Sequence, residues 1–180
     1  MMQGIFLIPI TKSSLDVATF LGFTLAELFG VPCDIIEQDF SIAQHYNSER
    51  RQYHSTEILK RLLPLAEGNS RQILGIIDVD LYIPILTFVY GEAQLGKRCA
   101  LISIFRLYQQ FYGLPEDETL LLQRSEKEAV HELGHTLGLP HCQNFECVMH
   151  YSHSVEYIDI KRNVFCPDCS RMAGFRSRWR

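Results

Sequence analysis

The sequence predicts an α/β fold in a single domain, and three observations lead to this. The chain has 180 residues and 47% of them are apolar, within the range of about 100–200 residues for one domain with a sizeable core. Strand-like and helix-like patterns alternate through its first two thirds, which indicates helices layered on a sheet. No repeat, low-complexity tract or long linker marks a second independent domain.

The first elements are a strand, a helix and a second strand. Residues 5–8 form an apolar run typical of a buried strand. Ser14 is expected to cap a helix that continues to about residue 29, where Gly30 and Pro32 stop it. Residues 33–37 are a plausible second strand.

The middle of the chain predicts another helix and a hairpin. Residues 55–65 place leucine and isoleucine at helical spacing behind a serine cap. The isoleucine-rich residues 73–79 suit a strand that is buried on both faces. Residues 87–90 and 100–104 flank the glycine-containing segment 91–96 like the two strands of a hairpin.

One long helix is expected over residues 118–137. It has an acidic start, which suits a helix N-terminus, and Gly138 follows its end. Its apolar positions recur at helical spacing: Leu121, Leu122, Ala129, Val130 and Leu133. Little regular pattern follows Gly138.

Composition excludes several classes of protein. The formal net charge of -4 gives no long-range attraction for nucleic acid or an anionic membrane. Residues 4–10 lack the charged flank and cleavage site of a signal peptide. The apolar stretch 73–90 is interrupted by Asp78, Asp80 and Pro84, so it is not expected to span a bilayer. We expect a cytoplasmic monomer, in which closely spaced cysteines are metal ligands rather than disulfides.

His131 and His135 are the centre of the predicted active site. Histidines at i and i+4 project from one helix face, so these two can bind one zinc ion. Glu132 lies about 100° around the helix from His131, where it can reach a water on the metal without being a ligand. Gly138 can adopt the positive φ that turns His141 back toward the metal.

This arrangement predicts hydrolysis of peptide or amide bonds. Three neutral imidazoles leave a tetrahedral zinc one open position for water, whose pKa zinc lowers to about 7. Glu132 then takes the proton of that water as it attacks the carbonyl. Two histidines on a helix can also be ordinary surface residues, but Gly138 and His141 add two further matches to the short motif.

A second metal site is predicted from cysteines. Cys142, Cys147, Cys166 and Cys169 can supply four thiolates to one zinc, which makes a closed structural site. A redox role for the last two is the main alternative, although no thioredoxin-like strand precedes them, and disulfides are another. The remaining pair, Cys33 and Cys99, lie in apolar contexts and are read as small buried side chains.

The run from His131 to His141, followed by Met149, resembles the metzincin metallopeptidases. Cys142 directly after the third histidine, then Cys147 and the pair Cys166 and Cys169, is similar to the archaemetzincins in particular. The resemblance covers residues 131–169. It implies a metzincin-like zincin fold with a mixed twisted β-sheet, an active-site helix and a small zinc-stabilised C-terminal subdomain. On this basis residues 1–138 form the N-terminal subdomain and residues 139–180 the C-terminal one.

The same resemblance implies roles around the metal. Met149 would form a hydrophobic turn beneath the catalytic zinc, a role compatible with simple core packing. An edge strand would pair with an extended peptide substrate, and residues 87–90 are the candidate. Tyr151 matches a position from which some metzincins direct a tyrosine at the zinc, or it packs in the turn. His150 and His153 stay unassigned.

Two other functions compete with a zinc metallopeptidase that carries one catalytic and one structural zinc. The first is a catalytically weak or inactive zinc-containing module that binds peptides or proteins, although such a module has no need of Glu132. The second is a zinc ribbon that binds nucleic acid through the tail of Arg176, Arg178 and Arg180. The acidic overall charge argues against it.

Overall fold

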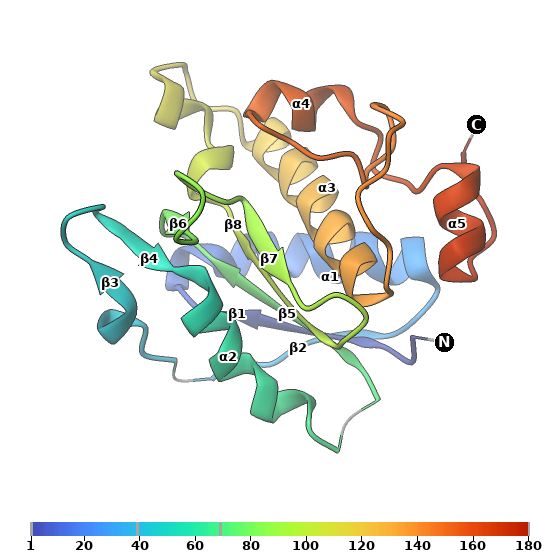
Figure 1. Ribbon diagram of the computed structural model, residues 1–180, viewed down its shortest axis with the longest axis horizontal. Coiled ribbons are helices and arrows are strands. Elements are labelled where there is room, and N and C mark those ends of the chain that lie inside the picture. Colours follow the sequence, from blue (N-terminus) through green and yellow to red (C-terminus); the bar gives the residue numbers. More distant parts are fainter. Residues whose placement is uncertain (1, 39, 69, 180) are drawn as a thin grey trace.

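The chain folds around a five-stranded mixed sheet (Figure 1). The structure is a computed structural model that describes residues 2–38, 40–68 and 70–179. In spatial order the strands are β2 (Cys33–Ile35), β1 (Ile5–Pro9), β5 (Gln72–Ile77), β8 (Cys99–Ser103) and β7 (Gly91–Ala93). The first four are parallel, and β7 is antiparallel to β8. A small second sheet contains β3 (Tyr46–Asn47), β4 (Gln52–His54) and β6 (Leu81–Tyr82).

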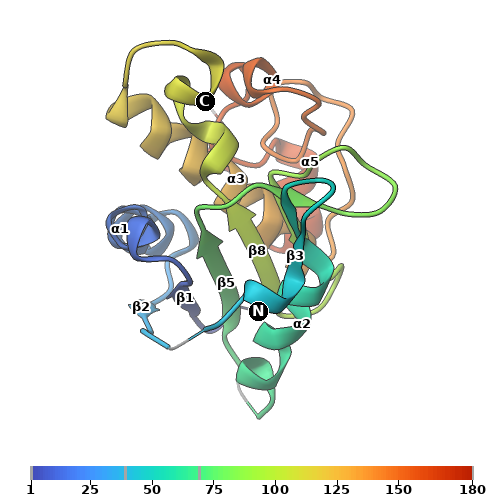
Figure 2. The same ribbon diagram turned by 90° about the vertical axis from the view of Figure 1, so that its left-hand side faces the viewer.

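Helices cover both faces of the large sheet. The α-helices are α1 (Leu15–Phe29), α2 (Ser55–Ala66), α3 (Glu118–Thr136), α4 (Val155–Ile160) and α5 (Pro167–Ala173). Short 3-10 turns are η1 (Lys12–Ser14), η2 (Ala43–His45), η3 (Phe105–Leu107) and η4 (Gln109–Tyr112). Figure 2 shows α1 and α2 on opposite sides of the sheet. Helix α3 lies on the α1 side, against α1 and β8.

Strand alternation builds these two faces. Along β5, Leu74 and Ile76 belong to the core beneath α1 and α3, whereas Ile73 and Ile77 belong to the core beneath α2. Every residue of β5 is buried. This strand is therefore covered on both faces, as its run of isoleucines predicts.

The ends of α1 and α2 differ in part from the prediction. Gly30 ends α1 with a φ of 67°, the left-handed conformation that favours glycine. Ser14 precedes α1 but does not cap it, because its hydroxyl donates to the carbonyls of Thr11 and Ile76. Helix α2 begins at Ser55 and is capped by His54, whose Nδ1 accepts from the Glu57 amide.

The predicted hairpin exists, but its first strand lies further along the chain. Residues 87–90 are not a strand of the large sheet; the edge strand is β7, whose Gly91 pairs with Ile102. Val89 instead forms an isolated bridge with Leu81, beside the small sheet. Thr87 and Val89 thus bond to the neighbouring sheet, whereas the Tyr90 carbonyl already accepts from the Ser103 amide of β8 at 2.7 Å.

The C-terminal segment, orange to red in Figure 1, lies against α3. Its Cys147, Val148, Met149 and Phe165 belong to the same buried cluster as α1 and α3. The tail also folds back, since Arg178 donates to the Glu27 carbonyl, while Arg180 lies outside the described residues. Within the described ranges, no helix combines the length and apolar composition that a membrane span requires.

Candidate metal centres

Helix α3 places two of the predicted ligands. The Asp117 side chain accepts from the Leu120 amide and caps the start of the helix. His131 and His135 follow near its C-terminal end, one turn apart. Gly138 has a φ of 88°, and the chain turns there so that His141 comes back to the other two. The three imidazoles each offer a nitrogen within 4.8 Å of the others.

Hydrogen bonds orient two of these rings. His131 Nδ1 lies 2.7 Å from the Val148 carbonyl, and His135 Nδ1 lies 2.7 Å from the Leu139 carbonyl. Because a carbonyl only accepts, each ring carries its proton on Nδ1 and presents a lone pair on Nε2. The two Nε2 atoms are 3.1 Å apart. Nitrogens that share one tetrahedral zinc lie about 3.3 Å apart, so this spacing fits a metal between them.

The surroundings lower the pKa of all three imidazoles. Burial holds the pKa of His131 well below its usual value, and Lys161 and His135 lower that pKa further. Burial also lowers the pKa of His135. The pKa of His141 is lowered by burial and by His135. Neutral imidazole is the form that binds metal, so lowered pKa values favour binding of a cation at this site.

Glu132 is buried beside the histidines, with 5% of its surface exposed. Its Oε2 has no hydrogen-bond partner among the described residues. Burial raises its pKa well above the usual value, Glu128 raises it further, and Lys161 opposes this. Gly91 on β7 leaves room for this carboxylate, because a Cβ there would lie 2.7 Å from Glu132 Oε1.

Met149 packs against Gly134 of helix α3. It is fully buried, and its sulfur fills the space beside Gly134, where a Cβ would lie 2.3 Å from Met149 Sδ. Gly134 lies between His131 and His135 on α3. The close approach of the turn to the ligand-bearing helix thus depends on glycine at this position.

The four predicted cysteines also come together. Cys142, Cys147, Cys166 and Cys169 place their sulfurs within 4.8 Å of one another. The Cys142 and Cys166 sulfurs are 3.8 Å apart, too far for a disulfide, whereas two thiolates on one tetrahedral zinc lie about 3.8 Å apart. Cys166 precedes α5, and Cys169 lies in its first turn.

The other two cysteines lie away from this cluster. Cys99 is fully buried in β8, and Cys33 is half-buried at the start of β2. Burial raises the pKa of each thiol to about 11. A thiol with such a pKa is protonated at neutral pH and is a poor nucleophile.

A cleft of about 600 Å³ contains the histidine cluster. Its walls are β7 and the preceding loop on one side and residues 151–153 on the other. Tyr151 packs against His141, with ring centroids 5.1 Å apart, and His153 packs against Tyr151 at 4.6 Å. His150 instead contacts the backbone, because its Nδ1 lies 2.8 Å from the carbonyl oxygen of Cys142.

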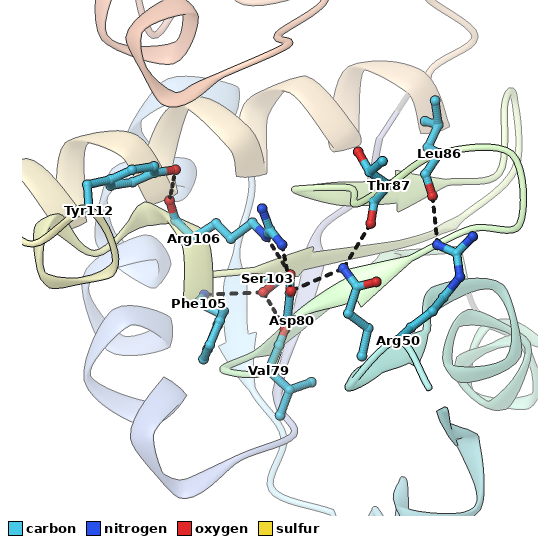
Figure 3. Close-up of polar contacts among 10 residues, drawn as sticks. Arg50, Val79, Asp80, Leu86, Thr87, Ser103, Phe105, Arg106 and Tyr112 are labelled. Carbon is cyan, nitrogen blue, oxygen red and sulfur yellow. Dashed lines mark hydrogen bonds and ion pairs between the residues drawn. The ribbon is translucent and has the colours of Figure 1, made fainter. Parts of the chain in front are cut away.

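Side chains hold the loop before β7 in place (Figure 3). Gln52 donates to the Thr87 carbonyl at 2.9 Å, and Arg50 donates to the Leu86 carbonyl at 3.0 Å. Gln52 also donates to Asp80, which receives two hydrogen bonds from Arg106 at 2.6 and 2.7 Å. These contacts fix the rim of the cleft to the small sheet.

Three charged residues of the cleft are not predicted from the sequence. Lys161 and Glu128 line the cleft as a buried ion pair, and Glu92 of β7 accepts hydrogen bonds from Ser55 and Thr56 at the start of α2. Glu128 lies one turn before Glu132, a spacing that can be recognised in the sequence. Lys161 belongs to a segment without regular pattern, so only the fold reveals its position.

Comparison with known proteins agrees with this geometry. The family described as "Peptidase family M54" matches residues 26–173. The archaemetzincin of Pyrococcus abyssi is 40% identical over 177 residues, which cover 95% of this chain and 94% of that protein. The archaemetzincin of Methanocaldococcus jannaschii is 41% identical over 169 residues, with 94% and 92% covered.

Two solved structures are similar to this chain over most of its length. The crystal structure of archaemetzincin from Archaeoglobus fulgidus, complexed with malonate, has a TM-score of 0.82 and 37% identity, and covers 94% of this chain and 99% of that one. A zinc-dependent peptidase from Methanocorpusculum labreanum has a TM-score of 0.82 at 25% identity, with 94% and 100% covered. The chain therefore belongs to peptidase family M54, with the archaemetzincins, and is a zinc metallopeptidase.

Proposed function

We propose that His131, His135 and His141 hold a catalytic zinc and that Glu132 is the general base in peptide-bond hydrolysis. The observation that carries this proposal is the convergence of three neutral imidazoles on one point of the cleft. Two of them are oriented by backbone carbonyls, and a buried carboxylate without a hydrogen-bond partner lies in the same cleft.

The residues divide the chemistry between them. Zinc bound there supplies a Lewis acid that polarises the peptide carbonyl and makes a nearby water more acidic. Glu132 accepts a proton from the attacking water and gives it to the amine of the departing fragment. Strand β7 is the edge of the sheet and lines the cleft, so an extended substrate can add there as a further strand.

The four-cysteine cluster is the proposed site of a second, structural zinc. Four thiolates close the coordination sphere, so this ion would stabilise residues 139–180 as a C-terminal subdomain and would not catalyse. Unbonded thiols at 3.8 Å are consistent with a reducing compartment such as the cytosol. The proposed content is two zinc ions per chain.

Metal analysis combined with peptide cleavage tests this function. Wild type and Glu132→Gln should each contain two zinc ions, and a peptide library should be cleaved by wild type only. Loss of the base should reduce turnover by about 10²–10⁴-fold. Undiminished cleavage by Glu132→Gln would refute the assigned base. A wild-type protein that holds zinc and binds peptides without cleaving them would instead support a peptide-binding module.

A further inference from the structure

A buried lysine is linked to the histidine cluster through one backbone oxygen. The side chain of Lys161, the residue directly after α4, is 0% exposed, so it cannot touch a substrate. Its Nζ donates to the Val148 carbonyl at 3.2 Å. The same carbonyl oxygen lies 2.7 Å from His131 Nδ1. The Val148 carbonyl therefore connects this lysine to a ligand of the proposed catalytic zinc.

The position of the Val148 carbonyl determines how the His131 ring is oriented. A carbonyl oxygen has two lone pairs, so it can accept from the imidazole N–H and from the ammonium at the same time. The Val148 amide in turn donates to the Val164 carbonyl at 3.3 Å. Residue 148 is thus held by Val164 at its amide and by Lys161 at its carbonyl. Histidines that bind metal depend on such partners for their ring orientation.

Glu128 holds the lysine from the side of helix α3. Its Oε1 lies 3.7 Å from Lys161 Nζ, and its side chain is 4% exposed. Because Glu128 is three residues before His131, the ammonium lies between the helix that carries the ligand and the turn that carries the carbonyl. A buried ion pair is often no more stable than apolar side chains of similar volume. Stability is therefore a weak reason for a lysine here, whereas a donor to the Val148 carbonyl is a specific one.

We propose that Lys161 is a positioning residue for the catalytic zinc, which it serves by fixing the Val148 carbonyl that orients His131. Glu128 balances the charge of the lysine and keeps its ammonium in place. The lysine needs no access to the substrate, because it acts through the backbone. This proposal rests on the proposed function, since it assumes that His131 holds zinc.

A double variant tests this role without leaving one buried charge unpaired. Lys161→Met with Glu128→Gln removes both charges and nearly keeps the shape of both side chains. The affinity of the histidine site for zinc should fall about 10–100-fold, the usual loss when a group that orients a metal ligand is removed. Competition with a series of chelators measures this affinity, and His131→Ala identifies which step of the titration belongs to the histidines. Unchanged affinity in the double variant would overturn the proposal.

A second ion pair between α3 and α4 provides the matched control. Arg124 donates to the Asp159 carboxylate at 2.7 Å and to the Leu107 carbonyl at 2.9 Å. Arg124→Met with Asp159→Asn thus loosens the same segment but keeps the donor to the Val148 carbonyl, so zinc affinity should be unchanged. An equal loss of affinity in the two double variants would also overturn the proposal, because Lys161 would then only anchor the segment.

The histidine rings give a readout that does not depend on turnover. His135 Nδ1 lies 2.7 Å from the Leu139 carbonyl, so its N–H signal is an internal reference for that of His131. In proton–nitrogen correlation spectra of zinc-loaded protein, the Nδ1–H signal of His131 should shift in the Lys161→Met, Glu128→Gln variant, and that of His135 should shift much less. An unchanged His131 signal would contradict the positioning role.

The same spectra separate this proposal from the proposed function. A wild-type protein that takes up no zinc at the histidines would refute the proposed function. The two Nδ1–H contacts exist without a metal, so spectra of the metal-free wild type and double variant would then still decide whether Lys161 orients His131. Zinc uptake and peptide cleavage by wild type, with identical zinc affinity and spectra in the double variant, would support the proposed function and refute the role of Lys161.

Discussion

Glu132 is the most unusual single residue, because its carboxylate is buried near a second carboxylate, that of Glu128. Burial and Glu128 raise its pKa well above the usual value of about 4.5 while the metal is absent. Between that usual value and the raised one, the metal-free protein therefore keeps a proton on this carboxyl. A divalent cation nearby favours the charged form.

We predict that zinc binding expels this proton. The zinc affinity of wild type should then increase as the pH rises above the usual pKa of a glutamate. The zinc affinity of Glu132→Gln should increase less over the same pH range. Titration calorimetry in two buffers of different ionisation enthalpy measures the protons released. The imidazoles, whose pKa values are lowered, contribute equally to both proteins. Equal proton release from wild type and variant would contradict a raised pKa for Glu132 in the metal-free site.

A second residue-scale prediction concerns Gly134. Alanine there would place its Cβ 2.3 Å from Met149 Sδ and 3.0 Å from Phe165 Cε1, both in a packed core. We expect Gly134→Ala to lower the free energy of unfolding by about 1–3 kcal/mol, measured by urea denaturation. Gly22→Ala is the control, because Gly22 also lies inside a helix but its Cβ would meet only Leu7 at 3.7 Å. That change should stabilise the protein by up to about 1 kcal/mol.

Residues of the site differ in how far the sequence reveals them. His131, Glu132 and His135 are recognisable because one helix sets their geometry, and α3 is signalled by its acidic start and apolar spacing. Lys161 could not be found this way, because the fold alone brings it from a patternless segment to Glu128.

At the scale of elements, strong local patterns locate helices and buried strands but not every boundary. The isoleucine run of β5 and the glycine stop of α1 predict these elements well. Residues 87–90 have the composition of a strand, yet Gln52 of β4 donates to the Thr87 carbonyl, and Arg50 in the turn before β4 donates to the preceding Leu86 carbonyl (Figure 3). Such side-chain contacts between distant segments have no signature in the local sequence.

The loop before β7 gives a prediction at this scale. Asp80→Asn weakens the paired hydrogen bonds from Arg106 and the contact with Gln52, so the rim of the cleft should loosen. Asp80 and Arg106 are only 13% and 23% exposed, and we expect a loss of about 1–3 kcal/mol in unfolding free energy. For peptide cleavage, KM should increase more than kcat decreases, because the rim positions substrate and carries no reacting group.

Asp168→Asn is the control for that measurement. Asp168 pairs with Arg171 on the surface of α5, where the side chains are 78% and 77% exposed. Removal of this pair should change stability by less than about 1 kcal/mol and leave KM unchanged. If Asp80→Asn behaves like the control, the network does not hold the rim.

For the whole molecule, the cysteine cluster connects the C-terminal segment to the catalytic centre. Cys142 directly follows His141, its amide donates to the Met149 carbonyl at 2.9 Å, and its own carbonyl lies 2.8 Å from His150 Nδ1. The cluster therefore holds together the third histidine and the turn beneath the histidines. The adjacency of His141 and Cys142 in the sequence suggests that the two metal centres are coupled. The hydrogen bonds of Cys142 with Met149 and His150 are visible only in the fold.

Loss of the structural ion should consequently damage both stability and the catalytic site. We predict that Cys169→Ser lowers the zinc content from two ions to one and the unfolding free energy by at least about 3 kcal/mol. Because His141 is then less well positioned, the remaining zinc should be removed by a weaker chelator than from wild type, which a competition titration measures. Cys33→Ser is the control, since Cys33 is half-buried in β2 and belongs to neither cluster. Unchanged chelator resistance in Cys169→Ser would show that the two centres are independent.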